Sequence, residues 1–85
     1  MHNTITFEKS YYSVDTDKTV TVQAHGDNLF DSIVYSSSDT SVATVDPVTG
    51  IVTGVKPGDV IITAESRNNP EVSAVTIVSV IGNEG

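Results

Sequence analysis

Histidine and serine are the residue types in this 85-residue chain that most often serve as bases and nucleophiles in catalysis. The two histidines are His2, next to the first residue, and His25, which precedes Gly26 and Asp27. A serine nucleophile needs a base that a third group orients, and the sequence has no G-x-S-x-G motif to shape such a site. Paired-carboxylate hydrolysis would need two acids across a cleft, which we do not expect in so small a domain. We therefore expect no enzymatic activity, no catalytic residue and no cofactor.

Aspartates are numerous enough to suggest a cation site. Calcium prefers six to eight oxygen ligands, usually from several carboxylates and carbonyls. We expect two loops to share one end of the molecule, and their carboxylates are Asp27, Asp31 and Asp46. The loops at the other end carry Asp15, Asp17, Asp39 and Asp59. The spacing does not match the fixed ligand pattern of an EF-hand loop. The alternative that we favour is that these carboxylates are solvated or accept hydrogen bonds from turn N–H groups.

Tyr11 and Tyr12 form the one adjacent aromatic pair in the sequence. Exposed aromatic rings flanked by amides and carboxylates are typical of carbohydrate sites, so Tyr11, Tyr12, Asn68 and Asn69 are candidate surface-binding residues, with Phe30 as a further loop candidate. In a strand, however, neighbouring side chains point to opposite faces. We therefore expect one tyrosine to face the core, and a half-buried strand pair at the edge of the fold is the alternative to a sugar site.

The charge of the chain excludes several classes of partner. The formal net charge is −7, and the four basic residues are scattered along the sequence. Phosphate-backbone and anionic-lipid binding both need clustered cations, so we expect neither nucleic-acid nor membrane-surface binding. No apolar run approaches the roughly 20 residues of a membrane span, which predicts no membrane insertion. The chain has no cysteine, so the hydrophobic core must stabilise the fold without disulfides. We also expect the isolated chain to be a monomer.

Apolar residues recur with a period of two, which is typical of strands with one buried face. Residues 19–24, for example, alternate between threonine or glutamine and valine or alanine. No segment has apolar spacing at the helical period. The chain is therefore predicted to be an all-β sandwich of about seven strands. We place them at Thr4–Glu8 with an irregular continuation through Tyr12–Val14, and at Thr19–His25, Ser32–Ser37, Val42–Val45, Ile51–Val55, Asp59–Ser66 and Ser73–Ile81.

Three turns can be predicted from residue type. Residues Asp46–Gly50 fit a four-residue hairpin loop, in which Asp46 accepts N–H bonds and Gly50 adopts a positive φ. Residues Lys56–Asp59 fit a type II turn with glycine at the position of positive φ. With both turns in place, residues 42–66 would form three consecutive antiparallel strands. Residues 39–41 suit a single helical or 3₁₀ turn capped by a side chain.

The alternation also predicts which side chains form the core. Two segments have apolar residues at successive positions, so we expect one of Ile61 and Val78 to be exposed. The predicted core consists of Ile5, Phe7, Val20, Val22, Ala24, Ile33, Tyr35, Val42, Val45, Val52, Val55, Val60, Ile62, Ala64, Val75 and Ile77.

The central third of the chain resembles the bacterial immunoglobulin-like domain, group 2. The resemblance rests on an aromatic residue, a Ser-rich Ser-Asp segment, Val-Ala-Thr-Val, a turn ending in glycine, a Val-Thr-x-Val strand, and glycine before Ile-Thr-Ala. In this chain these are Tyr35, residues 36–39, residues 42–45, Gly50, residues 52–55, Gly58 and residues 62–64. The family usually has tryptophan where this chain has Tyr35, whose hydroxyl must find a partner.

The resemblance implies an immunoglobulin-like Greek-key β-sandwich over residues 1–82, followed by a flexible tail or linker over 83–85. It implies a non-enzymatic structural or display module of a bacterial surface protein or phage virion, outside the cell. Such a module would act as a rigid spacer, or attach weakly to cell-surface carbohydrate or protein beside neighbouring domains. Two alternatives are a calcium-stabilised adhesin repeat that binds a host or matrix protein, and a self-associating domain that pairs through the edge of residues 73–81.

Overall fold

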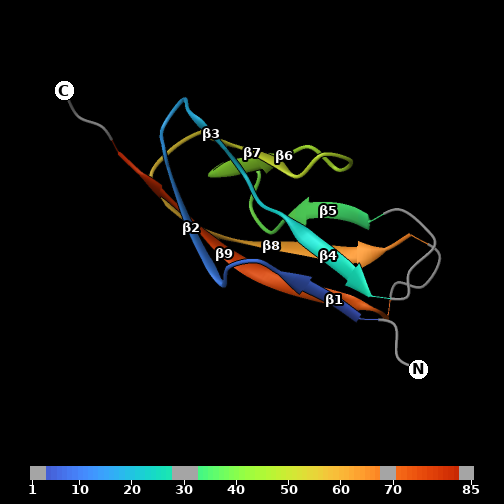
Figure 1. Ribbon diagram of the computed structural model, residues 1–85. Helices are drawn as coiled ribbons and strands as arrows, with labels where there is room; N and C mark the ends of the chain where they lie inside the picture. Colours follow the sequence, from blue (N-terminus) through green and yellow to red (C-terminus); the bar gives the residue numbers. More distant parts are fainter. Residues whose placement is uncertain (1–3, 28–32, 68–70, 83–85) are drawn as a thin grey trace.

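The computed structural model describes residues 4–27, 33–67 and 71–82, and this part of the chain is built from β-strands alone. The strands, labelled in Figure 1, are β1 (Thr4–Phe7), β2 (Tyr11–Asp15), β3 (Thr19–Thr21), β4 (Ala24–Asp27), β5 (Ile33–Ser37), β6 (Ala43–Val45), β7 (Ile51–Gly54), β8 (Gly58–Ser66) and β9 (Ser73–Ile81). The described residues include no helix that is long and apolar enough to cross a membrane.

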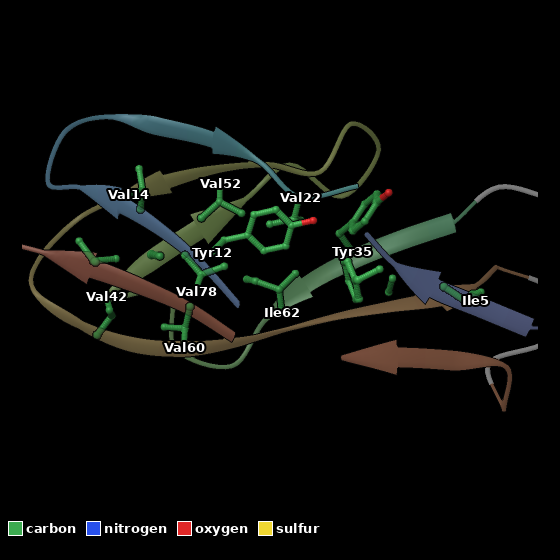
Figure 2. Close-up of a cluster of buried hydrophobic side chains, with 14 residues drawn as sticks. Ile5, Tyr12, Val14, Val22, Tyr35, Val42, Val52, Val60, Ile62 and Val78 are labelled. Carbon is green, nitrogen blue, oxygen red and sulfur yellow. The ribbon is translucent and has the colours of Figure 1, made fainter. Parts of the chain in front are cut away.

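The strands form two facing layers. One layer is the four-stranded sheet β2-β9-β8-β5, and the other contains the three-stranded sheet β3-β7-β6 with the β1-β4 pair. Figure 2 shows side chains of both layers meeting between the sheets, among them Tyr12, Val22, Val52 and Ile62. The prediction of an all-β, immunoglobulin-like sandwich is therefore confirmed.

Two predicted strands are each divided into two. The predicted strand Thr19–His25 becomes β3 and β4, because β3 pairs with β7 whereas β4 pairs with β1. Between them, the N–H group of Val22 donates to the carbonyl oxygen of Gly50 at 2.9 Å. The predicted irregular continuation after residue 8 is the regular strand β2, which runs parallel to β9 in the other layer. The described part thus has nine strands where the sequence predicted about seven.

The core consists of side chains that lie between the two layers. Most of the predicted core is buried or half-buried, but three predicted members are exposed: Val55 (45%), Val75 (62%) and Ile77 (44%). On β9 the other set of alternate side chains faces inward instead. The buried residues that the prediction omitted are Tyr12, Val14, Ala43, Val78 and Val80, together with the polar Ser66 and Thr76. The sequence predicted that either Ile61 or Val78 is exposed, and the exposed residue is Ile61, since Val78 is fully buried.

The hairpin between β6 and β7 has the predicted chemistry. The Asp46 carboxylate accepts hydrogen bonds from the N–H groups of Val48, at 2.8 Å, and Thr49, at 3.0 Å. Gly50 has a φ of +79°, and its N–H group donates to the Asp46 carbonyl oxygen at 3.0 Å. The Pro47 carbonyl accepts the Tyr35 N–H at 3.0 Å, so the loop also covers the edge of β5.

The other predicted turns have different outcomes. Residues 39–41 form the expected short turn, in which the Asp39 carbonyl accepts the N–H groups of Val42 and Ala43, each at 3.1 Å. The prediction of a type II hairpin turn at Lys56–Asp59 is wrong. β7 and β8 lie in different sheets, so this segment carries the chain from one layer to the other. Gly58 does have a positive φ, but its value of +153° is far from the roughly +80° of a type II turn.

Tyr35 stands where the bacterial immunoglobulin-like domains that the sequence resembles usually have tryptophan, and its hydroxyl does have a partner. The Ala24 N–H donates to Tyr35 Oη at 3.4 Å. The ring also contacts Phe7, with 6.4 Å between centroids and the planes tilted by 52°. The buried phenol therefore links β4 to β5 across the two layers.

Candidate functional site

The two adjacent tyrosines point to opposite faces of the four-stranded sheet. The Tyr12 side chain is buried at 7% exposure and lies between the layers, whereas Tyr11 is 54% exposed on the outer face. The Lys9 ammonium group lies 5.6 Å from the centroid of the Tyr12 ring, close enough for a cation–π contact. Tyr12 is thus part of the core, and Tyr11 is the member of the pair that a ligand can reach.

The neighbours of Tyr11 come from a distant part of the sequence. The parallel pairing of β2 with β9 places Tyr11 opposite Ile77, and the antiparallel pairing of β9 with β8 places Ile77 opposite Ile61. Tyr11, Ile77 and Ile61 therefore form one row across three strands, on the face of the sheet that is turned away from the core. Ile61 and Ile77 are 47% and 44% exposed.

The aspartates that were predicted as calcium ligands are not gathered into a site by the described residues. In this part of the chain, no group of three or more histidine or acidic side chains could hold a metal ion. Asp46 uses its carboxylate in the β6–β7 loop, and Asp27 ends β4. Asp31 lies outside the described residues, so calcium binding stays an untested prediction.

Two turn carboxylates have altered electrostatics for a structural reason. The hydroxyl and the backbone N–H of Ser41 both donate to Asp39 Oδ1. These hydrogen bonds lower the pKa of the Asp39 carboxyl group, and the bond from the hydroxyl has the larger effect. The N–H groups of Val48 and Thr49 similarly lower the pKa of Asp46. Hydrogen bonds to a carboxylate favour its charged form. Both groups are therefore caps of exposed turns, as the alternative to a metal site predicted.

The remaining candidates are separated from one another. His25 lies on β4, where its Nε2 contacts Glu8 Oε2 at 3.1 Å in an exposed pair. His2, Phe30, Asn68 and Asn69 lie outside the described residues, and their role in binding stays a prediction. Every buried side-chain nitrogen or oxygen in the described part has a hydrogen-bond partner, so these interior atoms offer no unpaired polar group to a ligand. Among the surface-binding candidates that lie in the described part of the chain, Tyr11 is therefore the exposed one.

Comparison with known proteins supports the same fold. A C-terminal 282-residue fragment of intimin, solved in complex with the intimin-binding domain of the translocated intimin receptor, superposes with a TM-score of 0.71 at 20% identity, over 89% of this chain and 30% of that one. Domains 1–6 of the surface layer protein SbsC give 0.72 at 21% identity, over 96% and 13%. Extracellular cadherin domains 1–4 of protocadherin gamma B7 give 0.70 at 16% identity, over 95% and 25%.

These structures are much longer than this chain, which spans less than a third of each of the three. At such low identity they establish the fold alone. Among proteins with curated descriptions, none matches the chain significantly. The sequence pattern of the bacterial Ig-like domain (group 2) does match, over residues 2–77. Since that match covers nearly the whole sequence, the chain belongs to the bacterial Ig-like domain family, group 2.

Proposed function

We propose that this chain is a non-enzymatic module of an extracellular bacterial surface or phage virion protein, which holds its neighbouring domains apart and provides a surface for weak attachment. The observation that carries the proposal is the path of the chain. β1 begins near one end of the sandwich and β9 ends at the other, as Figure 1 shows. The molecule measures 50 × 18 × 16 Å along its principal axes, so it is an elongated body entered and left at opposite ends.

The contacts of β2 with β9 suit a module that carries tension. Because these strands are parallel, pulling the two ends of the chain apart slides β2 along β9 and loads their hydrogen bonds together. Further bonds flank the pairing: Ile77 N–H to Ser10 O at 3.2 Å, Thr16 N–H to Ile81 O at 3.1 Å, and Thr76 Oγ1 to Lys9 O at 2.9 Å. We infer that this parallel pair resists extension of the module.

Single-molecule force spectroscopy tests the spacer function. The chain has no cysteine, so pulling handles can be attached at single introduced cysteines. Pulled between residues 4 and 82, the chain should unfold in one step at high force. Pulled between Val48, an exposed residue of the β6–β7 loop, and residue 82, it should unfold at a clearly lower force.

A matched pair of variants refines this test. Thr76→Val removes the buried hydroxyl that bonds to Lys9 O and should lower the end-to-end unfolding force. Thr44→Val makes the same change at an exposed position of β6 and should leave that force unchanged. Gradual extension at low force from the two ends, or equal forces for both pulling directions, would contradict the spacer function.

The similar structures hold several domains in a row or a bound receptor domain, which supports neighbouring domains and protein partners as a proposal for this chain. The printed descriptions name a surface layer protein and an intimin fragment bound to its receptor domain. The boundaries of the module, with a domain over 1–82 and a linker over 83–85, remain predictions. Attachment to carbohydrate also remains a prediction, with Tyr11 as its accessible residue.

A further inference from the structure

The outer face of the four-stranded sheet carries five of the eight large exposed hydrophobic side chains of the described residues, and one of them, Ile81, lies apart at the end of β9. Tyr11, Ile77 and Ile61 form a row, and Val75 lies two residues before Ile77 on the same face of β9. Their exposed fractions are 54%, 44%, 47% and 62%. We call these four residues the outer patch. From the spacing between strands, the row is about 10 Å across.

The outer patch is not required by the core. The opposite face of the same strands already packs against the second sheet through side chains such as Val60, Ile62 and Val78. At neighbouring outward positions of these strands the chain has small polar residues instead, namely Ser13, Thr63 and Ser79. Single exposed hydrophobic residues are ordinary, but adjacent ones on neighbouring strands are typical of interaction sites. Tyrosine is also enriched at the centre of protein interfaces.

Within β2, β8 and β9, every charged residue at an outward position is acidic, and Lys9, just before β2, has its ammonium group over the ring of the inward-facing Tyr12. On β8 the outward positions next to the patch carry Asp59, two residues before Ile61, and Glu65, which lies opposite Ser73 on β9. Asp15 occupies the last outward position of β2. The outward positions of β2, β8 and β9 contain no lysine or arginine. The apolar row therefore lies between carboxylates at both ends of the sheet, on a chain of net charge −7.

We propose that the outer patch is a docking surface for a protein whose apolar contact residues are surrounded by lysine and arginine. This deepens the attachment role proposed above and rests on it. A second copy of this chain would bring Asp59 and Glu65 against identical carboxylates, and like charges at an interface oppose association. A neutral sugar could stack on Tyr11, but its hydroxyl groups would leave the aliphatic side chains of Ile61, Val75 and Ile77 without an apolar partner.

Selection from a phage-displayed library of random 12-residue peptides on the whole chain, at low salt, tests this proposal. We expect enriched peptides to combine aromatic or aliphatic residues with lysine or arginine. The affinity of an enriched peptide should fall about tenfold or more in Tyr11→Thr and in Ile77→Thr, as for central interface residues. Threonine keeps the strand propensity at both positions. Val48→Thr changes an apolar and even more exposed position in the β6–β7 loop and should leave the affinity unchanged.

The acidic residues give an independent measurement. Asp59→Asn and Glu65→Gln should weaken peptide binding and reduce its dependence on salt, because screening acts on the charge pairs alone. Peptides that bind equally to Tyr11→Thr, or a library that yields no enriched sequence, would overturn the proposal. So would a chitohexaose titration that shifts the Tyr11 resonances, or a concentration-dependent dimer in sedimentation that Tyr11→Thr abolishes.

The outer patch and the spacer function can fail separately. Tyr11 points away from the core, so Tyr11→Thr should leave the end-to-end unfolding force unchanged while it weakens peptide binding about tenfold or more. A low unfolding force with intact peptide binding would refute the spacer alone.

Discussion

Replacing Gly50 by alanine should destabilise the protein more than any other single methyl added to the β6–β7 loop. Gly50 closes this loop with a φ of +79°. Its carbonyl oxygen accepts the Val22 N–H at 2.9 Å, which ties the loop to the chain between β3 and β4. A Cβ atom on Gly50 would lie 2.5 Å from the Val22 carbonyl oxygen and 3.1 Å from Cζ of the buried Tyr35 ring.

The expected magnitude follows from two contributions. An L-residue with a side chain in the left-handed region costs roughly 1–2 kcal/mol relative to glycine. The contact with the Val22 oxygen cannot be relieved by rotating a side chain, because both atoms are fixed to the backbone. The loop must shift, which lengthens the Val22–Gly50 hydrogen bond at a cost of about 1 kcal/mol. Together these predict a loss of roughly 2–3 kcal/mol in the free energy of unfolding, a large part of the stability of a domain of this size.

Equilibrium urea denaturation measures this loss, with two matched substitutions. Val48→Ala changes a 73% exposed side chain of the same loop and should alter the free energy of unfolding by less than about 0.5 kcal/mol. Gly54→Ala separates the two contributions. Its φ is not positive, but a Cβ there would lie 2.8 Å from the Asp15 carbonyl oxygen. A Gly50→Ala variant within about 1 kcal/mol of wild type would refute both the turn geometry and the close approach to Val22.

Three further predictions concern stability. Gly58→Ala should cost about 1 kcal/mol or more, because φ is +153° and the new Cβ would lie 3.2 Å from a Val42 methyl group; urea denaturation checks this. Val78→Ala should cost about 2 kcal/mol and Val75→Ala little in the same assay, because Val78 is fully buried and Val75 is 62% exposed. Backbone N–H groups lower the pKa of Asp46 below its ordinary value near 3.8, so its contribution is present above that pH and is lost as the pH falls through the lowered pKa. The difference in urea midpoint between wild type and Asp46→Asn should therefore shrink as the pH falls below about 4, and a pH-independent difference would contradict the hydrogen bonding.

Local chemistry explains why the β6–β7 hairpin could be predicted in detail. Its determinants lie within five consecutive residues: Asp46 accepts the loop N–H groups, Pro47 has a restricted φ, and Gly50 permits the positive φ. The Lys56–Asp59 prediction failed although its residues also suit a turn. Proline and glycine indicate a change of direction, but whether the next strand joins the same sheet or the facing one depends on distant pairing partners.

The inward face of β9 is the clearest limit of reasoning from alternation. Residues 73–81 contain apolar side chains in both sets of alternate positions, so the period predicts a strand but not which set is buried. Pairing with β8 decides it, because residues opposite one another share a face of the sheet. Val78 lies opposite Val60 and Thr76 opposite Ile62, both of which face the core. The sequence does not contain this register in any local signal.

The same error concealed half of the outer patch. Tyr11 was a candidate from the sequence, but Val75 and Ile77 were assigned to the core, so the row across the sheet could not be predicted. The signal that was available is the number of apolar residues in 73–81, which is larger than one buried face of a strand can hold. Such a surplus indicates that some of these side chains are exposed, although not which ones.

The short polar segment between β1 and β2 connects the two proposed functions. Residues 8–10 carry the chain from β1, which pairs with β4, to β2, which pairs with β9 in the other layer. This crossing creates the parallel pair that we expect to resist tension. It also places Tyr11 beside Ile77, which lies 66 positions later in the sequence. If the first strand had continued straight along β4, β9 would have kept an open edge and the row on the outer face would lack its tyrosine. The spacer and the docking surface therefore both depend on one change of layer early in the chain.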